Sequence, residues 1–171
     1  MGKKVFVFLL VLFAVSTVFC EWTLLYAQDE MTGEKTWYVS SSIVFPTEKL
    51  SFPYQNMAGR LVILYDPIKN IDMVALMLNS ILSLEDGVLY GDGFLYTTRV
   101  KWDDKVEDVR IFNGIFEKNV LFVDSEYIVK NMRSSKTMLL ELNLFSGGSV
   151  YFKFDLTGVS EAIDQLHSKY K

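Results

Sequence analysis

The stretch GGSVYFKFDLTGVSEAIDQL, residues 147–166, changes its hydrophobic period partway along. In its first half Val150, Phe152 and Phe154 alternate with polar residues, which is the pattern of a strand with one buried face. From Val159 the apolar residues recur every three or four positions, as they do on an amphipathic helix. The stretch therefore predicts a strand followed by a helix that folds back on the sheet.

Alternation of apolar and polar residues also predicts the other strands. Residues 137–145 alternate in the same way, and Gly147-Gly148 supplies the backbone freedom that a tight hairpin turn requires. In residues 36–45 the pattern places Ile43 and Phe45 on the buried face. The remaining segments with strand patterns are residues 21–28, 59–66, 94–102 and 109–123. The last of these contains Asn113-Gly114, which predicts a short hairpin or a bulge.

Two further segments carry helical signals. Residues 125–135 predict a short helix, and Thr157 or Ser160 is the expected N-cap of the final helix. Residues 71–84 are ambiguous, because their apolar residues fit either a helix or a strand that is buried on both faces. The neighbouring segments are strands with short turns, so we favour a strand there.

These patterns together predict one mainly β domain over residues 21–171. We expect an antiparallel β-sandwich-like arrangement with a short internal helix and a C-terminal helix packed on the sheet. The length is typical of a single domain with its own core. The chain has no linker, low-complexity tract or internal repeat.

The first twenty residues have the layout of a secretory signal peptide. Lys3 and Lys4 precede an apolar run, and the segment turns more polar before Cys20. The run is shorter than the roughly 20 residues of a membrane span, which is the alternative interpretation. Cleavage after Cys20 would leave a mature chain that begins at Glu21, whereas a lipidated Cys20 would anchor it. We therefore predict a secreted or periplasmic protein.

The C-terminal pattern is similar to that of the TagO/VasI-like exported proteins associated with bacterial type VI secretion and related envelope proteins. Those chains tend to close with a short helix, a hairpin, an F-D-L-x-G motif and an Ala-aliphatic helix. The matching residues here are Phe154, Asp155, Leu156, Gly158, Ala162 and Ile163. The resemblance implies an exported, mostly β domain with no known catalytic residues.

Few residues in the chain are of the types that carry catalysis. It contains one histidine, His167, and one cysteine, Cys20. A Ser-His-Asp triad, a Cys-His dyad and a His/Cys zinc site therefore lack their parts, and we predict no metal and no cofactor. The formal net charge of −4, without any Lys/Arg cluster, argues against nucleic acid as a partner.

Residues 99–104 form the one speculative ligand-binding segment. Arg99 and Lys101 share a strand face, Trp102 follows them, and Asp103 and Asp104 begin an acidic turn. These side chains could bind an acidic or sugar ligand. The simpler interpretation is that the cations pair with acids on a neighbouring strand and that the acids form a solvated turn.

The best functional hypothesis is an exported, non-enzymatic protein that binds another protein or an envelope component. One alternative is a carboxylate-dependent hydrolase such as a glycosidase, which needs two acids about 5–9.5 Å apart in a cleft. The candidate acids are Asp103, Asp104, Glu107 and Asp108. Another alternative is a small lipid or ligand carrier, which needs a cavity beneath the aliphatic strands.

Overall fold

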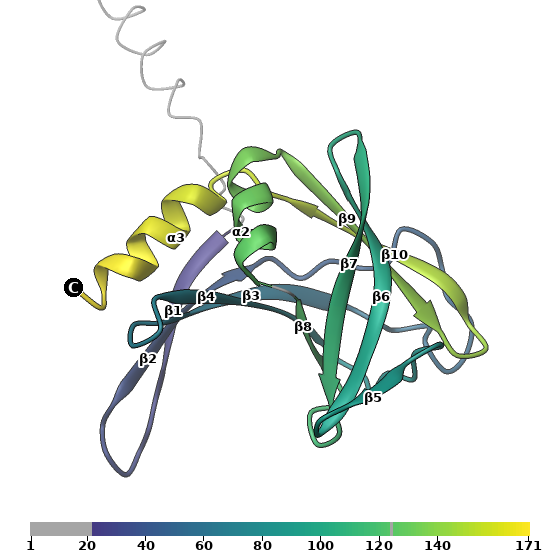
Figure 1. Ribbon diagram of the computed structural model, residues 1–171, viewed down its shortest axis with the longest axis horizontal. Helices are drawn as coiled ribbons and strands as arrows, with labels where there is room; N and C mark the ends of the chain where they lie inside the picture. The colour runs from purple at the N-terminus through teal and green to yellow at the C-terminus, as the bar shows by residue number, and fades with distance from the viewer. Residues whose placement is uncertain (1–21, 124) are drawn as a thin grey trace, which may run out of the picture.

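The computed structural model of the protein describes residues 22–123 and 125–171 (Figure 1). The predicted signal peptide, including Cys20, lies outside these residues. The strands are β1 (Trp22–Gln28), β2 (Lys35–Ser41), β3 (Gly59–Asp66), β4 (Ile71–Leu78), β5 (Val88–Tyr90), β6 (Gly93–Trp102), β7 (Lys105–Gly114), β8 (Val120–Val123), β9 (Thr137–Leu144) and β10 (Gly148–Asp155). The two helices in this part of the chain are α2 (Ser125–Ser134) and α3 (Val159–Ser168).

The ten described strands form one antiparallel sheet. Its order is β1-β2-β3-β4-β8-β7-β6-β9-β10, and β5 pairs with the first part of β6. Strands β6, β7 and β8 follow one another, and the chain then returns through α2 so that β9 lies beside β6. This is a Greek-key arrangement, in which the fourth strand lies beside the first. The fold class is therefore mainly β and antiparallel, as the sequence predicts.

The core lies between the two halves of the sheet and is covered on one side by the helices. Helix α3 packs on β1, β2 and β3, and α2 packs on β4 (Figure 1). We call the side of each strand that faces this core the inner face, and the opposite side the outer face. The largest fully buried side chains are Trp22, Phe152, Phe154, Met57, Leu61, Ile63, Leu76, Ile111, Leu121, Ile128, Met132 and Met138.

The first and last strands of the sheet are tied together. The indole N–H of Trp22 donates to the backbone oxygen of Asp155 at 3.0 Å. The loop after β2 also runs along β10, where the Thr47 N–H donates to the backbone oxygen of Tyr151 at 2.9 Å. Part of the free edge of β10 is therefore covered by the protein's own chain, which limits pairing with other molecules there.

The ambiguous segment 71–84 divides into two parts. Residues 71–78 are the strand β4, which confirms the preference for a strand in that part. Residues 79–87 form a strap across one end of the sheet. Its backbone bonds to Lys118 on one side and to Asn143 and Phe145 on the other. The strap contributes a single bridge, between Leu84 and Leu144.

Three local predictions are wrong. Strand β2 ends at Ser41, so Ile43 and Phe45 are exposed rather than buried. The pair Asn113-Gly114 ends β7 instead of forming a short hairpin, and a longer connection leads to β8. Helix α3 begins after Gly158, whose φ of 83° is in the left-handed region that favours glycine, and it has no side-chain cap.

Candidate functional site

The residues of the speculative segment 99–104 separate onto two faces of the sheet. Arg99 and Lys101 lie on the outer face of β6, whereas Trp102 is buried on the inner face, because successive side chains of a strand alternate. Lys101 lies 4.0 Å from Asp104, whose side chain is fully exposed. The segment therefore does not converge on one site.

Arg99 pairs with an acid on the neighbouring strand, which is the simpler of the two interpretations. Its Nε and Nη2 donate to the two carboxylate oxygens of Glu141 on β9, at 2.5 and 2.7 Å. Glu141 is 4% exposed and also accepts from the Tyr151 hydroxyl at 3.1 Å. The hydrogen bond from Arg99 outweighs desolvation and lowers the pKa of Glu141. The pair joins β6 to β9.

Glu107 lies on the inner side and binds four donors. Its Oε1 accepts from the Trp102 indole at 2.5 Å and from the Asn131 amide at 2.9 Å. Its Oε2 accepts from the Tyr127 hydroxyl at 2.5 Å and lies 3.1 Å from Lys105 Nζ. Desolvation raises the pKa of Glu107, but the hydrogen bonds outweigh it and the pKa is lowered. This carboxylate connects the β6–β7 hairpin to α2.

Asp103 is bound to the start of β9. It occupies the β6–β7 turn with a φ of 47°, and its Oδ1 accepts from the backbone N–H groups of Lys136 and Thr137 at 3.1 and 2.9 Å. Those bonds, the one from Lys136 first, lower its pKa. Asp103 and Glu107 are thus held by hydrogen bonds that build the fold.

The single histidine pairs with an acid of the sheet. His167 Nε2 lies 2.7 Å from Asp72 Oδ1, and its ring lies 4.3 Å from the ring of Tyr65, measured between centroids. The contacts fasten the last turn of α3 to β3 and β4. No group of three His, Cys, Asp or Glu residues suited to a metal ion occurs in the described parts of the chain.

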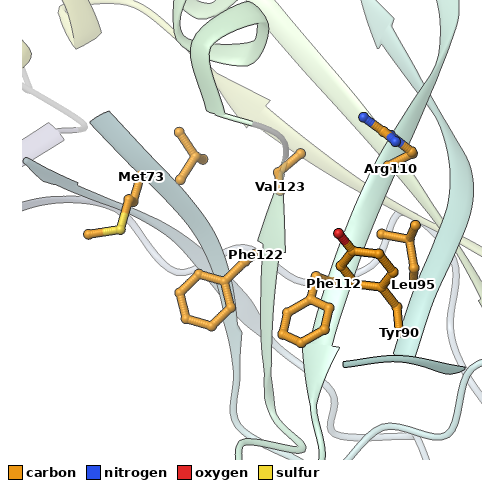
Figure 2. A pocket seen from close by; sticks show the side chains of 8 residues that line it. Met73, Tyr90, Leu95, Arg110, Phe112, Phe122 and Val123 are labelled. Atoms are coloured by element: carbon orange, nitrogen blue, oxygen red, sulfur yellow. The ribbon is translucent and has the colours of Figure 1, made fainter. Parts of the chain in front are cut away.

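An open apolar pocket lies on the outer face of the sheet, and the sequence reasoning did not single it out (Figure 2). Its volume is about 390 Å³. The side chains around it come from the five strands β4, β5, β6, β7 and β8. They are Met73, Val74, Tyr90, Leu95, Arg110, Phe112, Phe122 and Val123. Figure 2 shows Phe112 and Phe122 projecting from neighbouring strands into this region.

The strand register explains why these side chains gather. Leu95 on β6 is opposite Phe112 on β7, and Phe112 is opposite Phe122 on β8. Phe122 is opposite Ala75 on β4, and Ala75 is opposite Val62 on β3. These five residues, which we call the outer apolar row, form one line across five adjacent strands. Cross-strand neighbours of this kind are in direct side-chain contact.

The charges of the outer face have both signs. The charged side chains that alternate onto this face are Arg60, Asp66, Arg99, Lys101, Asp108, Arg110, Glu141, Lys153 and Asp155. Glu141 is buried under Arg99. Arg60 lies two residues from Val62 on β3, at one end of the outer apolar row. The outer face therefore presents an apolar centre with a cation beside one end of the row.

The signal for this pocket is present in the sequence, but it is not specific. Residues 71–78 are apolar on both faces, with Met73, Ala75 and Met77 directed outward. A strand of that kind is usually covered on both sides. Which other strands continue the apolar row depends on the β4–β8–β7 order, which no local pattern encodes.

One solved structure is similar to the chain. It is the crystal structure of invasion associated protein B from Bartonella henselae, with a TM-score of 0.55 and 12% sequence identity. The match covers 86% of this chain and 92% of that chain. At this identity it shows a shared fold. No family model and no curated protein matches the chain, so the resemblance to TagO/VasI-like proteins stays a prediction.

Proposed function

We propose that the protein is an exported, non-enzymatic binding protein and that its outer sheet face is the binding surface. The partner is a protein whose contact surface has an apolar centre and an acidic border. The observation that carries the proposal is the outer apolar row, in which Val62 and Ala75 are buried and the neighbouring Leu95, Phe112 and Phe122 stay partly exposed at the centre of a sheet. Contiguous exposed apolar surface with a polar rim is typical of interaction sites.

The cation beside the row determines which partner fits. A partner with apolar side chains alone would gain no advantage from Arg60 beside Val62. An acidic border on the partner would pair with this cation, speed association and suppress binding of basic proteins. Because such rim pairs are solvent-exposed, we expect the association rate to fall as salt is added.

The hydrogen bonds of the candidate acids Asp103 and Glu107 support a non-enzymatic role. A glycosidase needs one carboxyl group that stays protonated and a second carboxylate across a cleft. Asp103 and Glu107 have lowered pKa values because of their hydrogen bonds, so neither is poised as an acid. Among residues 22–123 and 125–171, no carboxylate lines the pocket on the outer face.

Export is the second part of the proposal and has a separate test. No helix within the described residues is long and apolar enough to cross a membrane. Mass spectrometry of the protein isolated from its natural source should give an N-terminus at Glu21. A mass that retains residues 1–20 would contradict cleavage. A diacylated or triacylated Cys20 would show that the protein is anchored to a membrane and not released.

The binding proposal is tested by a charge placed on the outer face. Met73 is 38% exposed and lines the pocket, so Met73→Glu should leave the fold intact and disrupt an apolar contact. Ile68→Glu is the matched control, because Ile68 is 94% exposed in the β3–β4 turn away from the row. Both proteins and the wild type are immobilised and exposed to envelope extract.

We expect one protein to be retained by the wild type and by Ile68→Glu and to be lost with Met73→Glu. The purified partner should then bind the wild type at least about tenfold more tightly than Met73→Glu. Equal retention by all three proteins would contradict the choice of surface. Retention of a second copy of this chain would mean that the surface mediates self-association and does not bind a different protein.

A further inference from the structure

A second cavity lies at the end of the sheet that the strap 79–87 closes. Its volume is about 550 Å³ and it is open to solvent. The strap forms one wall, the inner face of β6 and β7 forms another, and the β7–β8 connection completes it. We call this cavity the mouth. Ligand sites commonly occur at such places, where a curved sheet ends and its inner face is open.

The walls of the mouth are apolar, and three of their side chains remain accessible. Ile81 contributes from the strap, Phe94 from β6, and Ile115 from the β7–β8 connection. Ile81 is 69% exposed, and Phe94 and Ile115 are 38% and 43% exposed. An alkyl chain that entered the mouth would remove these apolar side chains from water, which is favourable in proportion to the area covered.

Two polar groups in the mouth have no partner within the described residues. The hydroxyl group of Tyr96 makes no hydrogen bond there, and the ammonium group of Lys118 makes no ion pair. The strap holds the Tyr96 ring in place, because a Cβ added at Gly87 would lie 2.4 Å from Tyr96 Cε1. Burial raises the pKa of Tyr96, so its hydroxyl keeps its proton and remains a donor.

The charge of the mouth selects the ligand. Lys118 is the one charged residue in its lining, and no carboxylate lines it. One cation and one neutral donor in the same lining suit a single carboxylate group, which can accept from both. A cationic amphiphile would meet Lys118 as a like charge, and an uncharged alcohol would leave it unpaired.

We propose that the mouth binds a free fatty acid, with its alkyl chain against Ile81, Phe94 and Ile115 and its carboxylate on Lys118 and Tyr96. This inference is independent of the proposed function, because the mouth opens at the strap and the outer apolar row lies on the opposite face of the sheet. It assigns a small-molecule ligand to a protein that uses another surface for a partner protein.

Calorimetric titration of the purified protein with octanoate, decanoate and dodecanoate below their micellar concentrations tests the inference. Affinity should rise with chain length, by up to about fourfold per methylene for a fully buried chain. Decanol and decyltrimethylammonium should bind more weakly than decanoate. Equal affinity for decanoate and decanol, or no measurable binding of any carboxylate, would overturn the proposal.

Variants locate the site. Lys118→Met should weaken decanoate binding about fivefold and leave decanol binding unchanged, and Lys130→Met on α2 is its control. Ile81→Asp should weaken decanoate binding about tenfold, because it places a charged carboxylate against the ligand's alkyl chain. Ile68→Asp is the matched control, since both isoleucines are exposed and neither supports the core.

A third variant separates the two surfaces. Met73→Glu alters the outer face and should leave decanoate binding unchanged, whereas Ile81→Asp should leave capture of the partner protein unchanged. If Met73→Glu abolishes decanoate binding and Ile81→Asp does not, the fatty acid occupies the outer pocket and the mouth assignment is wrong. Urea unfolding of each variant verifies that the fold is retained.

Discussion

Glu107 provides the sharpest test of how this fold is held together. Its carboxylate binds two donors that are shielded from water and two that are not. Trp102 is 4% exposed, whereas Tyr127 is 48% exposed and the side chain of Lys105 is 71% exposed. In Glu107→Ala, Lys105 and Tyr127 can form hydrogen bonds with water, so the loss of their bonds to Glu107 costs little. The Trp102 indole and, in part, the Asn131 amide cannot.

The magnitude follows from those two groups. A buried donor left without a partner costs about 1–3 kcal/mol, and a partly exposed one costs about 0.5–1 kcal/mol. Glu107→Ala should therefore lower the free energy of unfolding by about 1.5–4 kcal/mol. For a domain of this size that corresponds to a fall in Tm of roughly 5–15 °C. Glu107→Gln keeps one oxygen for Trp102 and Asn131 and should cost about half as much.

The measurement is equilibrium unfolding in urea, followed by tryptophan fluorescence and by circular dichroism. Asp108→Ala is the control, because Asp108 is the next residue on the same strand and is exposed on the outer face. It should change the free energy of unfolding by no more than about 0.5 kcal/mol. If Glu107→Ala costs no more than Asp108→Ala, the Trp102–Glu107 hydrogen bond does not stabilise the fold and the reasoning is refuted.

Two further predictions concern acid stability and close packing. The folded-state pKa of Glu141 is lowered by Arg99, so its contribution is complete above the unfolded value of about 4.3 and is lost as the pH falls through the lower folded value. Glu141→Gln should therefore reduce stability at pH 7 and flatten its decline between about pH 5 and pH 3, as measured by urea midpoints. A Cβ at Gly93 would lie 2.4 Å from the backbone oxygen of Asn113, so Gly93→Ala should cost about 1–3 kcal/mol. At Gly114 an added Cβ meets nothing within 4 Å, and Gly114→Ala should be nearly neutral in the same assay.

Local hydrophobic period predicted most of the strands and the two helices, α2 and α3, in the described part of the chain. Val150, Phe152 and Phe154 are buried on one face of β10, because a strand in a sheet directs alternate residues to the same side. The period failed at Ile43 and Phe45, because the regular strand ends at Ser41 and the chain pairs with β3 again through Val44, which packs against the core instead. Alternation predicts which residues share a side only while the strand continues without interruption.

Long-range pairing could not be predicted from local pattern. The Arg99–Glu141 pair depends on the β6–β9 register, in which Val100 is opposite Leu140. The outer apolar row likewise requires β8 to lie between β4 and β7. The strap and Lys118 meet only because the chain crosses the end of the sheet. The strands that carry the candidate sites can therefore be predicted from hydrophobic period, whereas the sites themselves depend on how the strands pair.

The bond between Trp22 and Asp155 makes completion of this fold a late event. It joins groups that are 133 residues apart, so the Trp22 indole cannot form this bond until nearly the whole chain has been synthesised. Closing so long a loop costs entropy before any contact rewards it, and folds dominated by such contacts form slowly. A chain shortened before β10 would thus lose its last strand and, with it, the acceptor of the Trp22 indole in its first strand.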